Sequence, residues 1–151
     1  MKVAVIDGQG GGIGKLITEK LRKALGDRVE IIALGTNAIA TTSMLKAGAN
    51  EGASGENAVC ETVKRVDVVL GTVAILLANS MLGELTPQMA SAIAGAGAEK
   101  ILIPLNKANV TIVGLYNEPL PHLVDMAVQL VEKNLTQLSA KKPKRGLKLV
   151  F

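Results

Sequence analysis

The sequence predicts a three-layer α/β domain in which a mostly parallel sheet lies between two layers of helices. Short apolar runs alternate along the chain with segments of helical periodicity, which is the pattern of strands joined by crossover helices. A glycine-rich loop separates the first apolar run from the first helical segment. The 151 residues, of which 48% are hydrophobic, are enough for one domain with a buried, aliphatic core.

Two strand–helix units are expected in the first part of the chain. Residues 3–6 are continuously apolar, which is typical of a strand buried on both faces. Residues 13–25 then show helical spacing and end before Gly26, a residue type that favours helix C-termini. Residues 29–34 predict a second strand, and residues 38–47 predict a second helix.

The middle of the chain continues this alternation less regularly. Residues 50–57 are polar and contain glycine, so a loop is expected there. A helix is expected over residues 56–64, and a third buried strand over residues 66–72. Residues 78–85 fit neither period clearly. Thr86-Pro87 is a start signal for the next helix, because it combines a capping residue with proline at the first helical position.

Two further strands are expected over residues 101–105 and 110–115. The four residues between them, 106–109, are too few for a parallel crossover, which needs a dozen or more. We therefore expect these strands to pair as a C-terminal antiparallel hairpin, which would make the sheet mixed.

The last helix is expected from the prolines at 119 and 121 to about Leu135. The single domain would then cover residues 1–139, and residues 140–151 would form a basic C-terminal tail. The tail is broken by proline and glycine, which favours a solvated end. Its alternating apolar residues would also suit docking to a sheet edge.

Most of the positive charge lies in this tail. The chain has 17 Lys and Arg against 13 Asp and Glu, and five of the basic residues, with no acidic one, follow residue 140. Residues 1–140 therefore hold 12 basic and 13 acidic residues, and the body is nearly neutral. Nucleic-acid-binding domains usually carry a basic patch on the fold, and single-strand binders add stacking aromatics. No nucleic-acid partner is expected.

Single cysteine and histidine residues limit the chemistry further. Cys60 alone excludes an internal disulfide or a cysteine-based zinc site, so no metal site is expected. Cys60 and His122 are interpreted as packing and surface residues. The longest uncharged run, residues 68–83, is too short for an ordinary transmembrane helix. With no signal-peptide pattern either, we expect a cytoplasmic protein without a membrane partner.

The segment most suggestive of function is the glycine-rich loop Asp7–Gly14, which directly follows the first strand. Its glycines let the backbone approach an anion, and the helix after it offers free N–H groups and a partial positive charge. Such sheets bind ligands at the carboxyl ends of their strands. We therefore expect a phosphate-bearing small molecule in contact with residues at several strand ends: Asp7, Gly8, Gln9, Gly10, Gly11, Gly12, Ile13, Gly14, Thr36, Asn37, Asn79 and Ser80.

Asp7 itself has three interpretations, since a carboxylate repels a bare phosphate. It could bind magnesium, accept a hydrogen bond from a ribose hydroxyl, or accept hydrogen bonds from the N–H groups of its own loop. The residues alone do not decide among the three.

Three phosphate-binding patterns compete for the loop. The dinucleotide pattern G-x-G-x-x-G fails, because Ile13 stands where the third glycine is required. The spacing G-x-x-x-G-x-G fits through Gly8, Gly12 and Gly14, and resembles the loop of short-chain dehydrogenases. The run that ends Gly14-Lys15 is similar to the variant P-loop of the ParA and MinD ATPases. Leu16, however, replaces the hydroxyl residue that would bind magnesium.

The resemblance to short-chain dehydrogenases does not extend to their catalytic Tyr-x-x-x-Lys. Tyr116 is followed by Leu120 where the lysine would stand. The acid expected after the second strand, which would hold an adenosine ribose, is also missing. Thr36 or Asn37 could hydrogen-bond a ribose instead, so the sequence leaves NAD and NADP open as cofactors.

Taken whole, residues 1 to about 115 resemble a bacterial family of small Rossmann-like proteins known as a domain of unknown function. The resemblance implies a Rossmann-like fold and no particular activity. It rests on five blocks: VIDGQGGGIGK (5–15), ALGTNAIAT (33–41), KAGAN (46–50), ANSMLGELTP (78–87) and ILIPLN (101–106).

Three functional hypotheses follow. The first is a nucleotide- or dinucleotide-binding protein of regulatory or accessory type, because no catalytic set accompanies the loop. The second is an NAD(P)-dependent oxidoreductase whose non-standard active site uses polar residues such as Asn79, Ser80 and Asn106. The third is an interaction or scaffold module with a vestigial loop. The nearly uncharged helix over residues 38–47 also predicts a homodimer or larger homo-oligomer.

Overall fold

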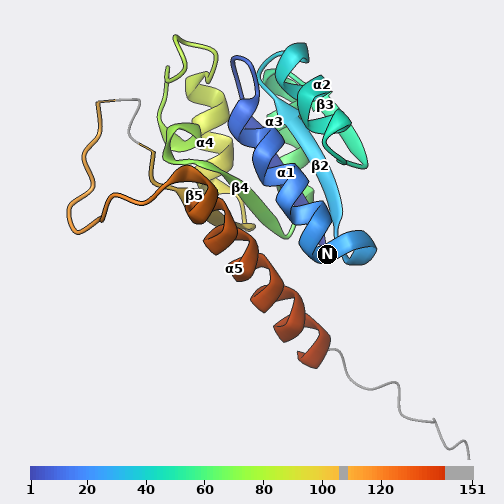
Figure 1. Cartoon of the computed structure of the whole chain (residues 1–151). Helices are drawn as coiled ribbons and strands as arrows, with labels where there is room; N and C mark the ends of the chain where they lie inside the picture. The colour runs from blue at the N-terminus through green and yellow to red at the C-terminus, as the bar shows by residue number, and fades with distance from the viewer. Residues whose placement is uncertain (106–108, 142–151) are drawn as a thin grey trace, which may run out of the picture.

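The computed structural model describes residues 1–105 and 109–141 and confirms the layered α/β fold. Its sheet has five parallel strands in the order β3-β2-β1-β4-β5 (Figure 1). The strands are β1 (Lys2–Asp7), β2 (Glu30–Gly35), β3 (Glu51–Ser54), β4 (Val68–Thr72) and β5 (Glu99–Ile103).

Helices cover both faces of this sheet. They are α1 (Gly12–Leu25), α2 (Ala38–Lys46), α3 (Glu56–Thr62), α4 (Pro87–Gly95) and α5 (Leu120–Lys141). Figure 1 shows α1 and α5 side by side over one face, and α3 and α4 pack on the other. Helix α2 packs against α1 and the edge formed by β2 and β3.

The central strand β1 joins the two halves of the core. Val3 and Val5 face the cluster that contains α1 and α5, whereas Ala4 and Ile6 face the cluster of α3 and α4. All four side chains are at most 1% exposed, as expected where successive residues of a strand point to opposite buried faces.

The strand order creates a divergence at the carboxyl end of β1. From β1 the chain runs outward through β2 to β3, and then returns to the other side of β1 with β4 and β5. Connections leave the neighbouring ends of β1 and β4 in opposite directions, which is the point where open parallel sheets bind ligands. The glycine loop lies at this point.

The loop expected over residues 50–57 is wrong, because Glu51–Ser54 forms strand β3. This edge strand pairs with residues 32–35 of β2, but only Ala53 is half-buried. A strand with so little buried side-chain surface has no apolar alternation. Backbone pairing with β2 and contact with α2, including a 2.7 Å hydrogen bond between the hydroxyls of Thr41 and Ser54, place it in the sheet.

The C-terminal antiparallel hairpin is also wrong. Residues 110–115 form no strand, and Val113 is 95% exposed. Pro104 follows β5 and cannot donate a ladder hydrogen bond, and the Leu105 N–H turns back to the Ile103 oxygen at 2.9 Å. This tight turn directs the chain away from the edge of β5. Residues 106–108 of the expected turn lie outside the described residues.

Helix α5 extends past the expected end near Leu135 to Lys141, so two residues assigned to the tail belong to it. Its inner face buries Val124, Ala127, Val128 and Val131 against the sheet. Residues 142–151 lie outside the described part of the chain, and their docking or solvation stays a prediction, as does the domain limit at residue 139.

Helix α1 should contribute strongly to stability through Leu21, which is fully buried between α1 and the sheet. We expect Leu21→Ala to lower the free energy of unfolding by about 2–5 kcal/mol. Leu82→Ala is the matched control, because Leu82 is 97% exposed, and it should change stability by less than about 0.5 kcal/mol. Urea unfolding measures both values, and equal losses would contradict this packing.

Candidate functional site

The glycine loop connects β1 to α1 in one tight turn. Gly11 adopts a left-handed φ of +73°, and its N–H donates to the Gly8 oxygen at 3.0 Å. The first hydrogen bond of α1 runs from Lys15 N to Gly11 O at 2.8 Å. Within the described residues, the amides of Gly12 and Ile13 therefore have no intrahelical acceptor and point outward from the helix end.

Asp7 braces this loop. Its carboxylate is 8% exposed and accepts hydrogen bonds from Gly8 N at 2.8 Å and from Gly14 N at 2.7 Å. The structure thus shows one of the three interpretations, acceptance from the loop's own N–H groups. A role of Asp7 toward a ligand stays a prediction.

Three glycines of the loop are explained by packing inside the protein. A Cβ on Gly8 would lie 2.6 Å from Thr36 Oγ1, and a Cβ on Gly11 would lie 2.7 Å from the Ala40 Cα. Gly14 would place a Cβ 2.6 Å from the Met44 sulfur. These positions need glycine whether or not a ligand binds.

Gly10 and Gly12 have no such explanation. A Cβ at either position would meet no atom within 4 Å, and neither residue has a positive φ. Both residues are exposed. The space they leave open lies outside the loop, beside the unpaired amides at the start of α1.

Glu84 connects this loop to the end of β2. Its Oε1 accepts hydrogen bonds from Gln9 N at 3.0 Å, from Thr36 Oγ1 at 2.8 Å and from Asn37 Nδ2 at 2.6 Å. The Asn37 amide, with help from Thr36 and Gln9, holds the pKa of the Glu84 carboxyl below its ordinary value against the opposing effect of burial. Glu84 is therefore ionised at neutral pH.

The predicted residues Thr36 and Asn37 are thus already engaged. Asn37 also caps α2 by accepting from Ala40 N at 2.8 Å, and its Nδ2 donates to the Gln9 oxygen at 2.9 Å. Sequence reasoning missed Glu84 as a site residue, because its partners lie far away in the chain. The sequence feature that could have indicated Glu84 is its position in ANSMLGELTP, one of the blocks that carry the family resemblance.

Glu84 is carried on residues 77–86, a segment with unusual backbone geometry. Asn79, Met81 and Leu82 have φ angles of +64°, +56° and +56°, a conformation that costs free energy for residues other than glycine. Ser80 is 8% exposed, and its hydroxyl donates to the Ala74 oxygen at 2.6 Å. Asn79 is exposed, and its contact with a ligand stays a prediction.

A cavity of about 360 Å³ opens between the ends of β1 and β4, beside this segment. Polar side chains in its wall are hydrogen-bonded to nearby backbone groups. Asp7 accepts from the loop amides, Ser80 donates to the Ala74 oxygen, and Thr72 accepts from Ala74 N at 3.3 Å. The lining residues are Asp7, Gly8, Gln9, Ile13, Thr72, Ala74, Ser80, Met81, Leu82 and Leu105.

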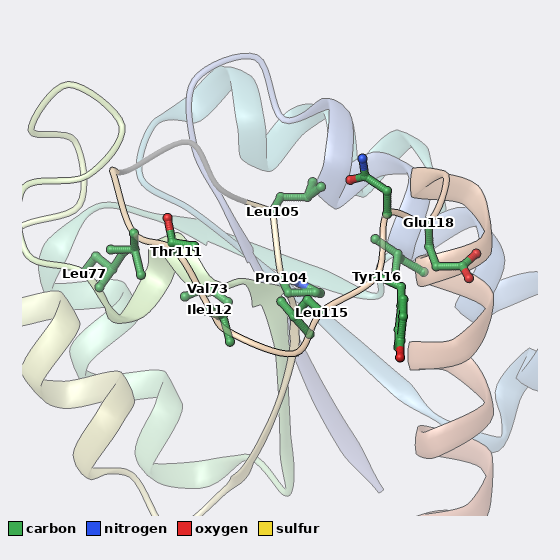
Figure 2. Close-up of a pocket in the computed structure, with 12 residues that line it drawn as sticks. Val73, Leu77, Pro104, Leu105, Thr111, Ile112, Leu115, Tyr116 and Glu118 are labelled. Atoms are coloured by element: carbon green, nitrogen blue, oxygen red, sulfur yellow. The ribbon is translucent and has the colours of Figure 1, made fainter.

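The segment that was expected to form a hairpin strand lines a second cavity of about 210 Å³. Figure 2 shows residues 109–119 curving around Pro104 and Leu105 and facing Val73 and Leu77. Leu105 borders both cavities, so the second one adjoins the first. Its wall combines apolar side chains with the polar residues Thr111, Asn117 and Glu118.

Other chemistry-bearing side chains stand apart from the site. Lys15 lies 3.9 Å from Glu19 and is 54% exposed, so it does not fold over the loop as a P-loop lysine would. Burial, reinforced by the Glu56 carboxylate, raises the pKa of the Cys60 thiol, which disfavours the nucleophilic thiolate. His122 pairs with Glu118 at 2.6 Å on the surface. In residues 1–105 and 109–141, no cluster of three potential metal ligands forms.

The chain matches the family described as "Domain of unknown function (DUF3842)" over residues 2–136. The chain belongs to this family. The match spans the glycine loop, the Glu84 segment and most of α5. A comparison with curated protein sequences gives no match.

Two solved structures are similar to this DUF3842 chain, and the first supports its fold. One is a dodecameric FMN-dependent UbiX-like decarboxylase from Escherichia coli O157:H7, with a TM-score of 0.50, 14% identity and coverage of 90% of this chain and 95% of that one. Another is AibC, with a TM-score of 0.47 and 16% identity, where the match covers 89% of this chain and 42% of that one. At such identity the first likeness concerns the fold alone.

No helix in the described part of the chain combines the length and hydrophobicity that a membrane span requires.

Substitution by alanine should change the stability of the protein differently at a tightly packed loop glycine and at an open one. Gly11→Ala forces a Cβ into a left-handed position against Ala40 and should destabilise the protein by more than about 1 kcal/mol. Gly12→Ala, at the exposed helix start, should leave stability unchanged or raise it by roughly 0.4–1 kcal/mol. Thermal unfolding of both variants measures this difference, and similar losses would show that packing explains Gly12 too.

The Glu84 contacts should make stability depend on pH. Because the folded-state pKa is below the ordinary value, the carboxylate stabilises the protein at neutral pH, and this contribution is lost as the pH falls through the folded pKa. Glu84→Gln should therefore lose less stability than the wild type between pH ~7 and about pH 3. Urea unfolding across that range is the measurement.

Glu51→Gln is the control for this experiment, since Glu51 is exposed at the amino end of β3, remote from the glycine loop. It should follow the wild-type pH dependence. If the wild-type and Glu84→Gln curves run parallel, the carboxylate does not hold the segment in place.

Proposed function

We propose that this protein binds a nucleotide through its phosphate group at the glycine loop, in a regulatory or accessory role. One observation carries the proposal. Gly12 is a glycine that neither packing nor backbone geometry requires, and within the described residues its own amide and that of Ile13 have no acceptor. A ligand that approaches the backbone closely would explain both features together.

The physics of the helix end supports an anionic ligand. The unpaired amides of Gly12 and Ile13 lie at the positive end of α1, a helix of 14 residues. The loop and the neighbouring cavity sit where β1 and β4 diverge, the position at which this class of sheet binds ligands.

The cavity wall supports binding more than catalysis. The hydroxyls of Thr72 and Ser80 and the carboxylate of Asp7 are each bonded to backbone groups, and neither hydroxyl is hydrogen-bonded to a side chain that could act as a general base in the described residues. The oxidoreductase hypothesis would need a reacting group here, and no observation favours one.

The size of the cavity favours a mononucleotide. Small-molecule sites commonly span roughly 300–1,000 Å³, and a cavity of about 360 Å³ is near the lower limit. A dinucleotide such as NAD or NADP would have to extend beyond it. Flavin mononucleotide is a further candidate, because the similar UbiX-like structure is described as FMN-dependent.

A homo-oligomer is part of the proposal. Helix α2 buries Ala40, Thr41 and Met44 within the domain, but Ile39 remains 71% exposed on a helix with one charged residue. An exposed aliphatic side chain on so weakly charged a surface suits contact with a second copy. The dodecameric assembly of the similar structure is in keeping with this.

Ligand binding can be tested by thermal unfolding with AMP, ATP, FMN, FAD, NAD, NADP and coenzyme A, each with and without magnesium. A ligand at about 100 times its Kd should stabilise the wild type by roughly 2.7 kcal/mol. Gly12→Val should abolish the shift while the domain stays folded, because its side chain fills the space beside the free amides.

Gly97→Val is the matched control, since Gly97 is exposed, lies before β5 and has no neighbour within 4 Å of a Cβ. It should retain the ligand-induced shift. No shift with any of these compounds would favour the scaffold hypothesis, and an unchanged shift in Gly12→Val would mean that the loop is only a turn.

A further inference from the structure

Glu84 lies next to the end of β2, although the residues that directly follow this strand in the sequence include no acid. In nucleotide-binding sheets of this topology, an acid after the second strand commonly accepts hydrogen bonds from the ribose hydroxyls. Here β2 is followed by Thr36 and Asn37. Glu84 reaches the same place from the segment after β4, and its Oε1 lies 2.8 Å from Thr36 Oγ1 and 2.6 Å from Asn37 Nδ2.

Only one of the two Glu84 oxygens is used by the protein in the described residues. Oε1 accepts all three hydrogen bonds, from Gln9, Thr36 and Asn37, and these fix the carboxylate between the glycine loop and β2. Oε2 takes none of them. The side chain is half-buried, so this second oxygen is an acceptor that a ligand can reach.

We propose that Glu84 recognises the sugar of the bound nucleotide, its Oε2 accepting a hydrogen bond from the 2′-hydroxyl of an unphosphorylated ribose. This inference rests on the proposed function, because the phosphate must lie at the start of α1. It commits the site to ribonucleotides without a phosphate on the 2′ position.

The negative charge of Glu84 would make the site selective between a hydroxyl and a phosphate on the sugar. A carboxylate accepts from a hydroxyl group but repels a phosphate group at the same distance, so it favours one ligand and rejects the other. Thr36 and Asn37 cannot supply that selectivity, since their donors already point at Glu84. No Lys or Arg makes a hydrogen bond or ion pair with Glu84 among the described residues.

The carboxylate is also preorganised for this role. Three donors from two separate segments hold it, and the positive φ angles of Asn79, Met81 and Leu82 shape the turn that delivers it. Backbone strain of this kind persists where the surrounding structure enforces it, and it is concentrated at binding sites. Little ordering of the side chain would remain to oppose ligand binding.

The test is calorimetric titration of three probes: AMP, 2′-deoxy-AMP and adenosine 2′,5′-bisphosphate. The wild type should bind AMP about 10-fold more tightly than the deoxy compound. It should bind the bisphosphate at least ~100-fold more weakly than AMP, because like charges would meet at Glu84. Glu84→Gln should narrow the AMP-to-bisphosphate ratio to less than about 10-fold, and Glu51→Gln should keep the wild-type ratios.

Several outcomes would overturn the inference. Equal wild-type affinity for AMP and the bisphosphate would do so, as would a Glu84→Gln variant that keeps the wild-type ratio. A uniform gain in affinity for all three probes in Glu84→Gln would show that the carboxylate blocks the site. Absence of AMP binding overturns it as well, and the proposed function falls with it only if no phosphate compound shifts the unfolding temperature.

Discussion

The hydrogen bonds of the Asp7 carboxylate determine the shape on which the candidate site depends. By accepting from the amides of Gly8 and Gly14, Asp7 ties both ends of the glycine loop to the end of β1. A buried carboxylate satisfied in this way keeps the loop formed without a ligand. Gly12 lies between these anchors, and its surroundings stay open. Such preorganisation lowers the entropic cost of binding.

Residues 77–86 add a second constraint from the other side of the sheet. They pass beside the cavity between β1 and β4, and deliver Glu84 to the loop and to the end of β2. The glycine loop and this segment would therefore have separate roles in ligand binding. Backbone amides would hold the phosphate, and one carboxylate would select what is attached to it.

Much of the fold could be predicted because its signals are local. Continuous apolar runs indicated β1, β2 and β4, and Thr86 caps α4 as its sequence predicted, accepting from Met89 N at 3.1 Å. Strand β3 escaped prediction because it buries almost no side chains. The expected hairpin failed because apolar residues 110–115 line a cavity instead of pairing with β5. Glu84 could not be placed, since its partners lie 47, 48 and 75 residues away.

Amide NMR can show whether the open start of α1 holds a phosphate group. Titration of the ¹⁵N-labelled protein with AMP should shift the Gly12 and Ile13 amide signals most, because their N–H groups would become hydrogen-bond donors. Signals from the distant half of α5, around Asn134, should stay unchanged. Shifts confined to other regions, or no shift at Gly12 and Ile13 with any phosphate compound, would contradict a phosphate site at the start of α1.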